Sequence, residues 1–394
     1  MPWPFARNLA EKLSAVLAPD VADASSSPST RFAFKLFREL ATADASNVFF
    51  SPSSIMLCLA MVQELASGET RQDMAKALEI AGLTPAAAQL VIDALKAAFR
   101  PRPEVTVRSA NSLWGSEHAP VRPELAAKLH DIYDAEWTAL DLAAADAVPR
   151  INAWVNDKTQ GMIRHILDKL SPLAVLVAIN AVYFKGSWTI PFIRAGTQDG
   201  PFTTATGQTK QLPMMLQSAK YDYYEDKRLQ AVALPYNGGL TMYVVLPAER
   251  IDRQQFQRSL TAGWWESWLA ELEPMPGTLR LPRFKLDYGA SLEPALKALG
   301  MERAFDRNRA EFDGIHADEQ AVWIDRVVHR AVAEVNEEGT VAAAATMVTE
   351  CLSASRPVRR PRLFQMIVNR PFFVAIRDEL TGAILFLGWI GDPQ

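Results

Sequence analysis

Apolar residues recur at helical spacing in several stretches of the chain. In residues 30–42 they include Phe32, Leu36, Phe37 and Leu40, which predicts an amphipathic helix. Residues 56–65 are almost continuously apolar and follow a proline at position 52, so they predict a helix that is buried on most sides. Further helices are predicted over 68–78, 84–98, 123–139 and 151–163.

Other stretches have the composition of strands. Residues 173–188 contain an apolar run before Asn180, as expected for a strand that is buried on both faces. Residues 321–333 are rich in β-branched residues and alternate in part. The remaining predicted strands are 105–114, 229–236, 240–247, 279–286, 368–376 and 384–388.

Composition excludes some functional classes. Of the 394 residues, 49% are hydrophobic and 22% charged, with a net charge of −4, so nothing favours nucleic acid as a partner. The apolar runs are too short or too interrupted to span a bilayer, and we expect no membrane partner. Cys58 and Cys351 are the only cysteines and make no disulfide framework. Cys58, in an apolar helix, is expected to be an inert core residue.

The first 29 residues predict a helix followed by a polar linker. Arg7 could begin a secretion signal, but Glu11 and Lys12 interrupt the apolar centre that such a signal requires. We therefore recognise no signal peptide. This favours a cytoplasmic protein and leaves secretion open.

One segment, residues 334–355, has no clear structural preference. Four successive alanines after position 341 favour a helix, whereas the threonines and valines around them favour a strand. In a strand, Thr340, Ala342, Ala344, Thr346 and Val348 would share one face. That face is small and largely apolar, so it could enter between two existing strands. An alanine-rich exposed loop is the simpler interpretation.

The string EEGTVAAAAT at 337–346 resembles the reactive-loop hinge of serpins, the serine protease inhibitors that insert their own loop. Four other segments resemble serpin motifs in the expected order: 47–55, 151–163, 180–188 and 368–376. The resemblance runs from about residue 30 to 392. It implies one domain over 30–394 with a mixed α/β serpin fold, in which three β-sheets and eight or nine helices carry an exposed reactive loop at about 337–362.

The resemblance also implies positions for the moving parts. Ser51, Ser54, Asn180 and His329 match a hydrogen-bonded cluster behind the central strands, where the sheet must open. Trp188 matches the aromatic residue at the top of that sheet. Arg283 matches a basic residue that pairs with the acid at the start of the hinge, although a solvated Arg and a solvated Glu are the alternative. The hinge comprises Glu337, Glu338, Gly339, Thr340, Val341, Ala342, Ala343, Ala344 and Ala345.

Family spacing implies the bond that a protease would attack. Sixteen residues after Glu337 lies Ser353–Ala354, and Leu352–Ser353 is the competing bond. Serine at the bait position suits an elastase-like protease, and leucine suits a chymotrypsin- or subtilisin-like one. The implied partner is thus a serine protease held in a covalent complex by a monomer without a metal or cofactor. The basic segment 356–362 is either a solvated linker or a second contact with the protease, and Cys351 is either a redox control point or incidental.

No motif indicates an enzyme. The chain lacks G-x-S-x-G, H-E-x-x-H, C-x-x-C and phosphate-binding glycine motifs. Its five histidines, His329 among them, have no ligand-like spacing. We therefore predict an inhibitor with no catalytic residue. A non-inhibitory serpin that binds or chaperones other molecules, and an unrelated α/β enzyme, are the alternatives.

Overall fold

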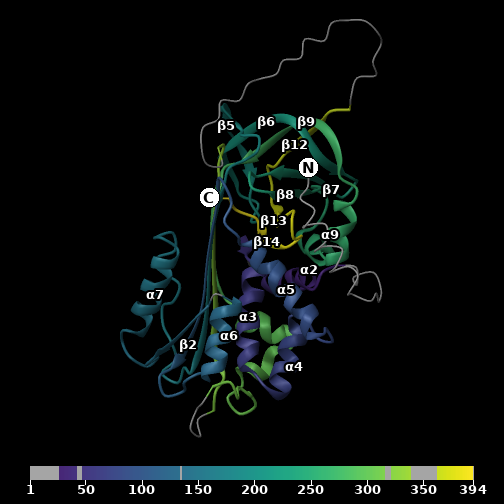
Figure 1. The fold of residues 1–394 in the computed structure, drawn as a ribbon. Helices are drawn as coiled ribbons and strands as arrows, with labels where there is room; N and C mark the ends of the chain where they lie inside the picture. The colour runs from purple at the N-terminus through teal and green to yellow at the C-terminus, as the bar shows by residue number, and fades with distance from the viewer. Residues whose placement is uncertain (1–25, 42–46, 134, 316–320, 339–361, 394) are drawn as a thin grey trace, which may run out of the picture.

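The computed structural model describes residues 26–41, 47–133, 135–315, 321–338 and 362–393. Within these ranges the chain forms two sheets and nine α-helices (Figure 1). The nine helices are α2 (Pro28–Leu40), α3 (Pro52–Leu65), α4 (Gly68–Ala77), α5 (Pro85–Ala98), α6 (Pro123–Tyr133), α7 (Ala147–Lys158), α8 (Arg253–Ser259), α9 (Ala262–Leu269) and α10 (Glu293–Leu296).

The five-stranded sheet positions the candidate site. Its strand order is β10-β11-β4-β2-β3. Helices α3, α5 and α6 lie on one side of it, and α7 lies on the other (Figure 1). The strands are β2 (Val105–Ser116), β3 (Glu136–Leu140), β4 (Leu176–Gly186), β10 (Phe284–Ser291) and β11 (Ile324–Val335).

The second sheet has nine strands and combines two of the three sheets that the family resemblance implies. Its strand order is β1-β14-β13-β8-β7-β6-β9-β12, with β5 also paired to β6. The 17-residue strand β6 pairs with β5 and β9 along most of its length and with β7 at its end. The described residues therefore form two sheets, and not the three that the family resemblance implies. The strands are β1 (Asn47–Phe50), β5 (Ile193–Thr203), β6 (Thr209–Glu225), β7 (Leu229–Pro235), β8 (Leu240–Pro247), β9 (Glu273–Pro282), β12 (Phe364–Ile367), β13 (Phe372–Asp378) and β14 (Ile384–Ile390).

Strand β4 is buried on both faces, as its apolar run predicts. Val177, Ile179 and Ala181 belong to the cluster beneath α7. Val182 and Phe184 belong to the main core on the opposite face. Side chains alternate along a strand, so Asn180 occupies a core-facing position in the same row as Val182.

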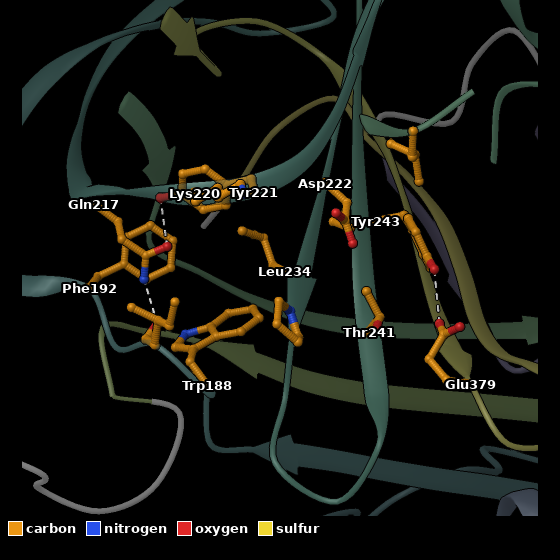
Figure 2. A pocket seen from close by; sticks show the side chains of 14 residues that line it. Trp188, Phe192, Gln217, Lys220, Tyr221, Asp222, Leu234, Thr241, Tyr243 and Glu379 are labelled. Atoms are coloured by element: carbon orange, nitrogen blue, oxygen red, sulfur yellow. Dashed lines mark hydrogen bonds between the residues drawn. The ribbon is translucent and has the colours of Figure 1, made fainter. Parts of the chain in front are cut away.

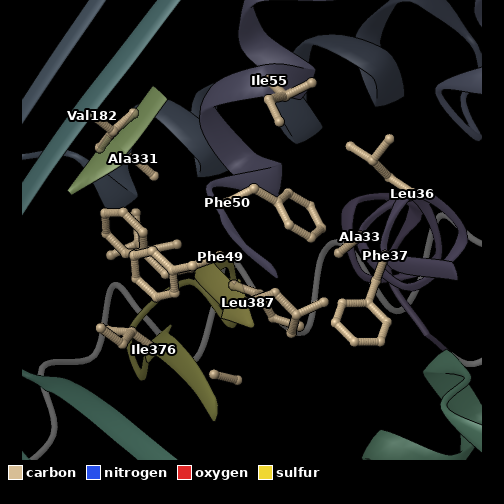
Figure 3. Packing of buried hydrophobic residues seen from close by; sticks show 14 of the residues in the cluster. Ala33, Leu36, Phe37, Phe49, Phe50, Ile55, Val182, Ala331, Ile376 and Leu387 are labelled. Carbon is tan, nitrogen blue, oxygen red and sulfur yellow. The ribbon is translucent and has the colours of Figure 1, made fainter. Parts of the chain in front are cut away.

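Helix α3 lies in the main core, where aromatic side chains from distant segments meet. Phe37 of α2 stacks on Phe50 of β1 with 6.5 Å between ring centroids, and Phe49 stacks on Phe386 of β14 at 5.2 Å. Figure 3 shows the rings of Phe37, Phe49 and Phe50 between the first helices, the central sheet and the C-terminal strands. The rings fix the start of α3, and therefore Ser51 and Ser54, against the sheet.

Two predicted helices differ from the structure. The segment predicted as helical over 123–139 ends as a helix at Tyr133, and Glu136–Leu140 forms β3. Trp137 and Thr138 favour a strand, and pairing with β2 outweighs the helical pattern before them. Helix α7 begins at Ala147, earlier than expected, and ends at Lys158. Gly161 follows with a φ of 81°, which stops the chain from continuing as a helix.

The predicted N-terminal helix and most of the 1–29 segment lie outside the described residues. No described helix is long and apolar enough to cross a membrane.

Candidate functional site

The site is centred on the contact between β4 and β11, which we call the seam. These two strands are parallel and pair from Ile324↔Leu176 to Ala333↔Phe184. Halfway along, His329 lies opposite Asn180. Both side chains are fully buried. A new strand could enter this sheet at the seam only if the pair separated.

The side-chain amide of Asn180 bonds across the seam to β11 and, on its own side, to α3 and β2. Its Oδ1 lies 2.5 Å from His329 Nδ1, across the seam. Its Nδ2 donates to Ser54 Oγ of α3 at 2.5 Å and also to Asn111 Oδ1 of β2. The amide of Asn180 therefore connects β4, α3 and β2 to β11.

The imidazole of His329 is held neutral. Its Nε2 accepts the backbone N–H of Ser51 at 3.1 Å, so Nδ1 carries the proton and donates to Asn180. Burial lowers the pKa of His329 from 6.5 to about 3, because the surroundings disfavour the charged form. Ser51 also caps α3, accepting the N–H of Ser54 at 3.3 Å. The start of α3 is thus fixed to the seam.

Two members of the cluster were not found from the sequence. Ser109 Oγ lies 3.0 Å from Ser54 Oγ, and Asn111 bonds to Asn180. Asn111 is directly opposite Asn180 in the β2–β4 register. The alignment of β2 against β4 would have identified Asn111, but the sequence does not give the register between two strands.

A second group of contacts holds the start of the hinge at the top of the sheet. Only 5% of Glu337 is exposed. Its carboxylate accepts from Arg283 Nε at 3.1 Å and from Thr197 Oγ1 at 2.7 Å. Burial opposes ionisation, but the bonds from Arg283 and Thr197 outweigh it and hold the pKa of Glu337 below its ordinary value. Phe192 N–H donates to Glu337 O at 2.9 Å.

Trp188 contacts the residue immediately before this hinge. Its Nε1 donates to Asn336 O at 2.8 Å, and its ring stacks on Tyr236 with centroids 4.0 Å apart. Figure 2 shows Trp188 beside a cavity of about 260 Å³, with Phe192 and Leu234 among the lining residues. Trp188, Arg283 and Glu337 therefore meet in one region. We call the contacts of Glu337 and Asn336 the hinge lock.

Most of the predicted loop lies outside the described residues. Gly339 to Ala345, Cys351, the candidate bond residues Leu352, Ser353 and Ala354, and positions 356–361 lie outside the described residues. Arg362 is described and pairs with Glu225 at 2.6 Å. Cys58 is fully buried, and burial raises the pKa of its thiol to about 12.

The geometry suits a mechanical switch. The described residues contain no group of three or more His, Cys, Asp and Glu side chains that could hold a metal ion. His329 uses both ring nitrogens within the cluster, so neither is available as a base. The cluster can break and re-form hydrogen bonds as strands separate.

Comparisons with known proteins agree with this geometry. A family model described as Serpin (serine protease inhibitor) matches residues 27–393. A serpin-like protein of Thermococcus kodakarensis is 36% identical over 92% of this chain and 84% of its own length. The leukocyte elastase inhibitor of Bos taurus is 34% identical over 93% and 99%. The crystal structure of tengpin, a thermophilic serpin in the native state, has a TM-score of 0.83 at 28% identity and covers 93% of each chain.

Proposed function

The chain belongs to the serpin family, and from this membership and the seam geometry we propose that it traps a serine protease by inserting its own cleaved loop between β4 and β11. The matching family model is described as a serine protease inhibitor, and the family is not one of enzymes; inhibition by this chain is part of the proposal. The protease would attack the loop and form an acyl-enzyme. The released hinge would then enter the seam and carry the protease with it.

The observation that carries this proposal is the polar cluster at a core-facing seam. Asn180 and His329 occupy positions where the neighbouring core-facing residues, such as Val182 and Ala331, are apolar. In a fully apolar row the backbone ladder between β4 and β11 would be the directional contact, with no side-chain hydrogen bond across the seam. Hydrogen bonds have fixed geometry and break over short distances, so this row has two defined states. It holds the closed sheet firmly and gives way when the strands part.

Insertion would release energy because the loop gains partners along two strands. About a dozen new backbone hydrogen bonds at roughly 1 kcal/mol each supply on the order of 10 kcal/mol. The small side chains from Thr340 to Ala345 suit this movement, since they enter without opening large gaps. The hinge lock supplies the opposing restraint before cleavage.

The target follows from the bait bond. We propose cleavage at Ser353–Ala354, with Leu352–Ser353 as the competing bond, and therefore an elastase-, chymotrypsin- or subtilisin-like protease. The name of one relative, leukocyte elastase inhibitor, supports an elastase-like partner. A monomeric state, a cytoplasmic location and a single domain over 30–394 stay predictions.

A denaturing gel tests the proposal. The protein is mixed separately with elastase, chymotrypsin, subtilisin and trypsin, and we expect a covalent band of summed mass with at least one of the first three. Mass spectrometry of the released fragment then identifies the cleaved bond. Cleavage without a covalent band for every protease would support the non-inhibitory alternative instead.

Two matched variants test insertion itself. Thr340→Arg places a charge on the small-residue face of the hinge, which must be buried early. We expect it to convert trapping into simple cleavage. Val341→Arg places the same charge on the opposite face of the strand and is expected to lose less. Equal trapping by Thr340→Arg and the unmodified protein would refute loop insertion.

A further inference from the structure

The buried hydroxyl of Tyr236 has no hydrogen-bond partner among the residues that the structure describes. Tyr236 directly follows β7, and only 3% of it is exposed. Buried tyrosine hydroxyls usually find a partner, and a hydroxyl without one makes the folded state less stable. Burial also raises the pKa of the Tyr236 phenol well above its ordinary value, so the hydroxyl keeps its proton and can donate.

Tyr236 lies where the seam meets the hinge lock. Its ring stacks on Trp188 with 4.0 Å between centroids, and it packs edge-on against Phe184 at 5.1 Å. Phe184 pairs with Ala333 at the upper end of the seam, and Trp188 donates to the carbonyl of Asn336. Tyr236 therefore contacts one residue of the seam and one residue of the hinge lock.

A glycine in β4 leaves room for the ring of Tyr236. A Cβ atom at Gly186 would lie 2.8 Å from a ring carbon of Tyr236, whereas carbon atoms pack at about 3.5–4.0 Å. Gly186 is two residues beyond Phe184, so it lies in the same core-facing row of β4. The ring therefore covers the core side of β4 just beyond the last pair of the seam.

The proposed insertion would bring Thr340 to this position. The hinge would run antiparallel to β11, and with residues 336–339 as the turn Thr340 would lie opposite Val335. Val335 belongs to the main core, and directly opposed residues of antiparallel strands share a face. Continuing the β4–β11 register by two residues puts Val335 level with Gly186. The side chain of Thr340 would thus enter beside Gly186 and point towards Tyr236.

We propose that Tyr236 is a positioning residue for insertion, whose hydroxyl is unpaired in the closed sheet and bonds to the hydroxyl of Thr340 once the hinge has entered. This inference rests on the proposed function. An unpaired hydroxyl raises the free energy of the closed form, and pairing lowers that of the inserted form. Both changes favour insertion. The inference gives a reason for threonine at the start of the small-residue face, where Ala342 and Ala344 follow.

A double-mutant cycle tests the bond in the form that should contain it. Tyr236→Phe removes one hydroxyl, and Thr340→Val removes the other while keeping a branched side chain. The two single variants, the double variant and the unmodified chain are unfolded in guanidinium chloride, both intact and after cleavage. Thermolysin serves for the cleavage, because a zinc protease forms no acyl-enzyme and is not trapped. Mass spectrometry checks that the cut lies beyond Ala345.

The expected results differ between the two forms. In the intact form, Tyr236→Phe should raise the unfolding midpoint, and Thr340→Val should have the same effect with or without the Tyr236 hydroxyl. In the cleaved form, each single variant should lower the midpoint, and the double variant should be no worse than either. The coupling there should be about fivefold in the unfolding equilibrium constant. A lower midpoint for intact Tyr236→Phe, or no coupling in the cleaved form, would overturn the inference.

Tyr221→Phe is the matched control. Tyr221 is also buried, but its hydroxyl donates to Gln217 Oε1 at 2.7 Å. Its removal should therefore lower the midpoint of the intact form and show no coupling with Thr340→Val after cleavage. Coupling as large as that of Tyr236→Phe would mean that the cycle does not report a specific bond, and would also overturn the inference.

Trapping gives a second readout, which a merely structural role of Tyr236 would not change. With slower insertion, more Tyr236→Phe molecules should be cleaved for each protease trapped, by several-fold on a denaturing gel, although the intact variant is the more stable protein. An unchanged ratio would contradict the role in insertion. If cleavage leaves the unmodified chain no more resistant to unfolding, the proposed function fails and this inference with it. If resistance rises without coupling, only the role of Tyr236 fails.

Discussion

Asn180→Ala is the substitution that tests the seam most directly. It removes the acceptor of His329 Nδ1–H and the donor to Ser54 and Asn111. A buried polar group left without a partner costs about 1–3 kcal/mol. His329 is fully buried and loses its only side-chain acceptor, whereas Ser54 keeps Ser109. We therefore expect a loss of about 3 kcal/mol in the free energy of unfolding, and a fall of the heat transition on the order of 5 °C.

The distinguishing result is kinetic. The closed sheet of Asn180→Ala should open without cleavage, so that the intact loop inserts spontaneously. The assay is incubation without protease well below the heat transition. Samples taken at intervals are tested for remaining inhibition of elastase and for the appearance of a form that withstands higher temperature. We expect inhibition to disappear several times faster than in the unmodified chain.

Ser112→Ala is the matched control for this experiment. Ser112 is also fully buried on a strand of the same sheet, and its hydroxyl accepts Trp114 Nε1–H at 2.8 Å. Its loss destabilises the fold by about 1–3 kcal/mol without touching the seam. If Asn180→Ala lost inhibition no faster than Ser112→Ala at equal distance from the heat transition, the seam cluster would not be the switch.

Three further predictions concern the same machinery. Between about pH 6.5 and pH 3 the free energy of unfolding should fall by at most about 1.4 kcal/mol for each pH unit of acidification. The reason is that His329 becomes protonated in the unfolded chain and not in the native chain. Urea unfolding at several pH values should show a smaller dependence of this free energy on pH in His329→Gln. Arg283→Ala should leave the buried carboxylate of Glu337 with fewer hydrogen-bond donors and shorten the half-life of inhibition at 37 °C. Arg283→Lys should have a half-life between those of Arg283→Ala and the unmodified protein. Equal half-lives for the two variants and the unmodified protein would contradict the hinge lock. Arg330 donates to His165 O at 2.5 Å and to Asp287 of β10 at 2.7 and 2.8 Å. Arg330→Gln should therefore speed amide exchange in residues 163–169 and around Asp287, and unchanged exchange in residues 163–169 would refute the role of the His165 contact.

Much of the fold was predictable because its elements have strong local signals. The apolar run of β4 and the proline-initiated α3 are examples, and both lie where the sequence places them. Strand β3 was missed because its five residues follow a helical pattern, and only pairing with β2 makes them a strand. Two of the expected sheets form one because the 17-residue strand β6 pairs with strands of both. The sequence composition did not show where so long a strand begins and ends.

The structure brings the side chains of Ser54, Asn180 and His329 together, and their role as a switch stays a prediction. Serine, asparagine and histidine at Ser54, Asn180 and His329 carry no helical or strand signal that would identify them. The family resemblance alone pointed to them. Asn111 was missed because its partner is defined by the register between β2 and β4, and Ser109 because its contact with Ser54 depends on how α3 packs on the sheet. Sequence reasoning can name polar residues in apolar segments, but only the paired strands show which of them meet.

The cluster also explains why a polar seam is compatible with a stable native state. Its bonds join two further elements to β4 and β11: the start of α3 through Ser51 and Ser54, and β2 through Asn111. Because buried polar groups are costly when unpaired, partial opening breaks several bonds before any new one forms. In the proposed mechanism that cost would be a barrier that delays insertion, without making the closed sheet the most stable arrangement. An incoming strand would supply new backbone partners to β4 and β11 along the seam, in place of the ladder that opening breaks.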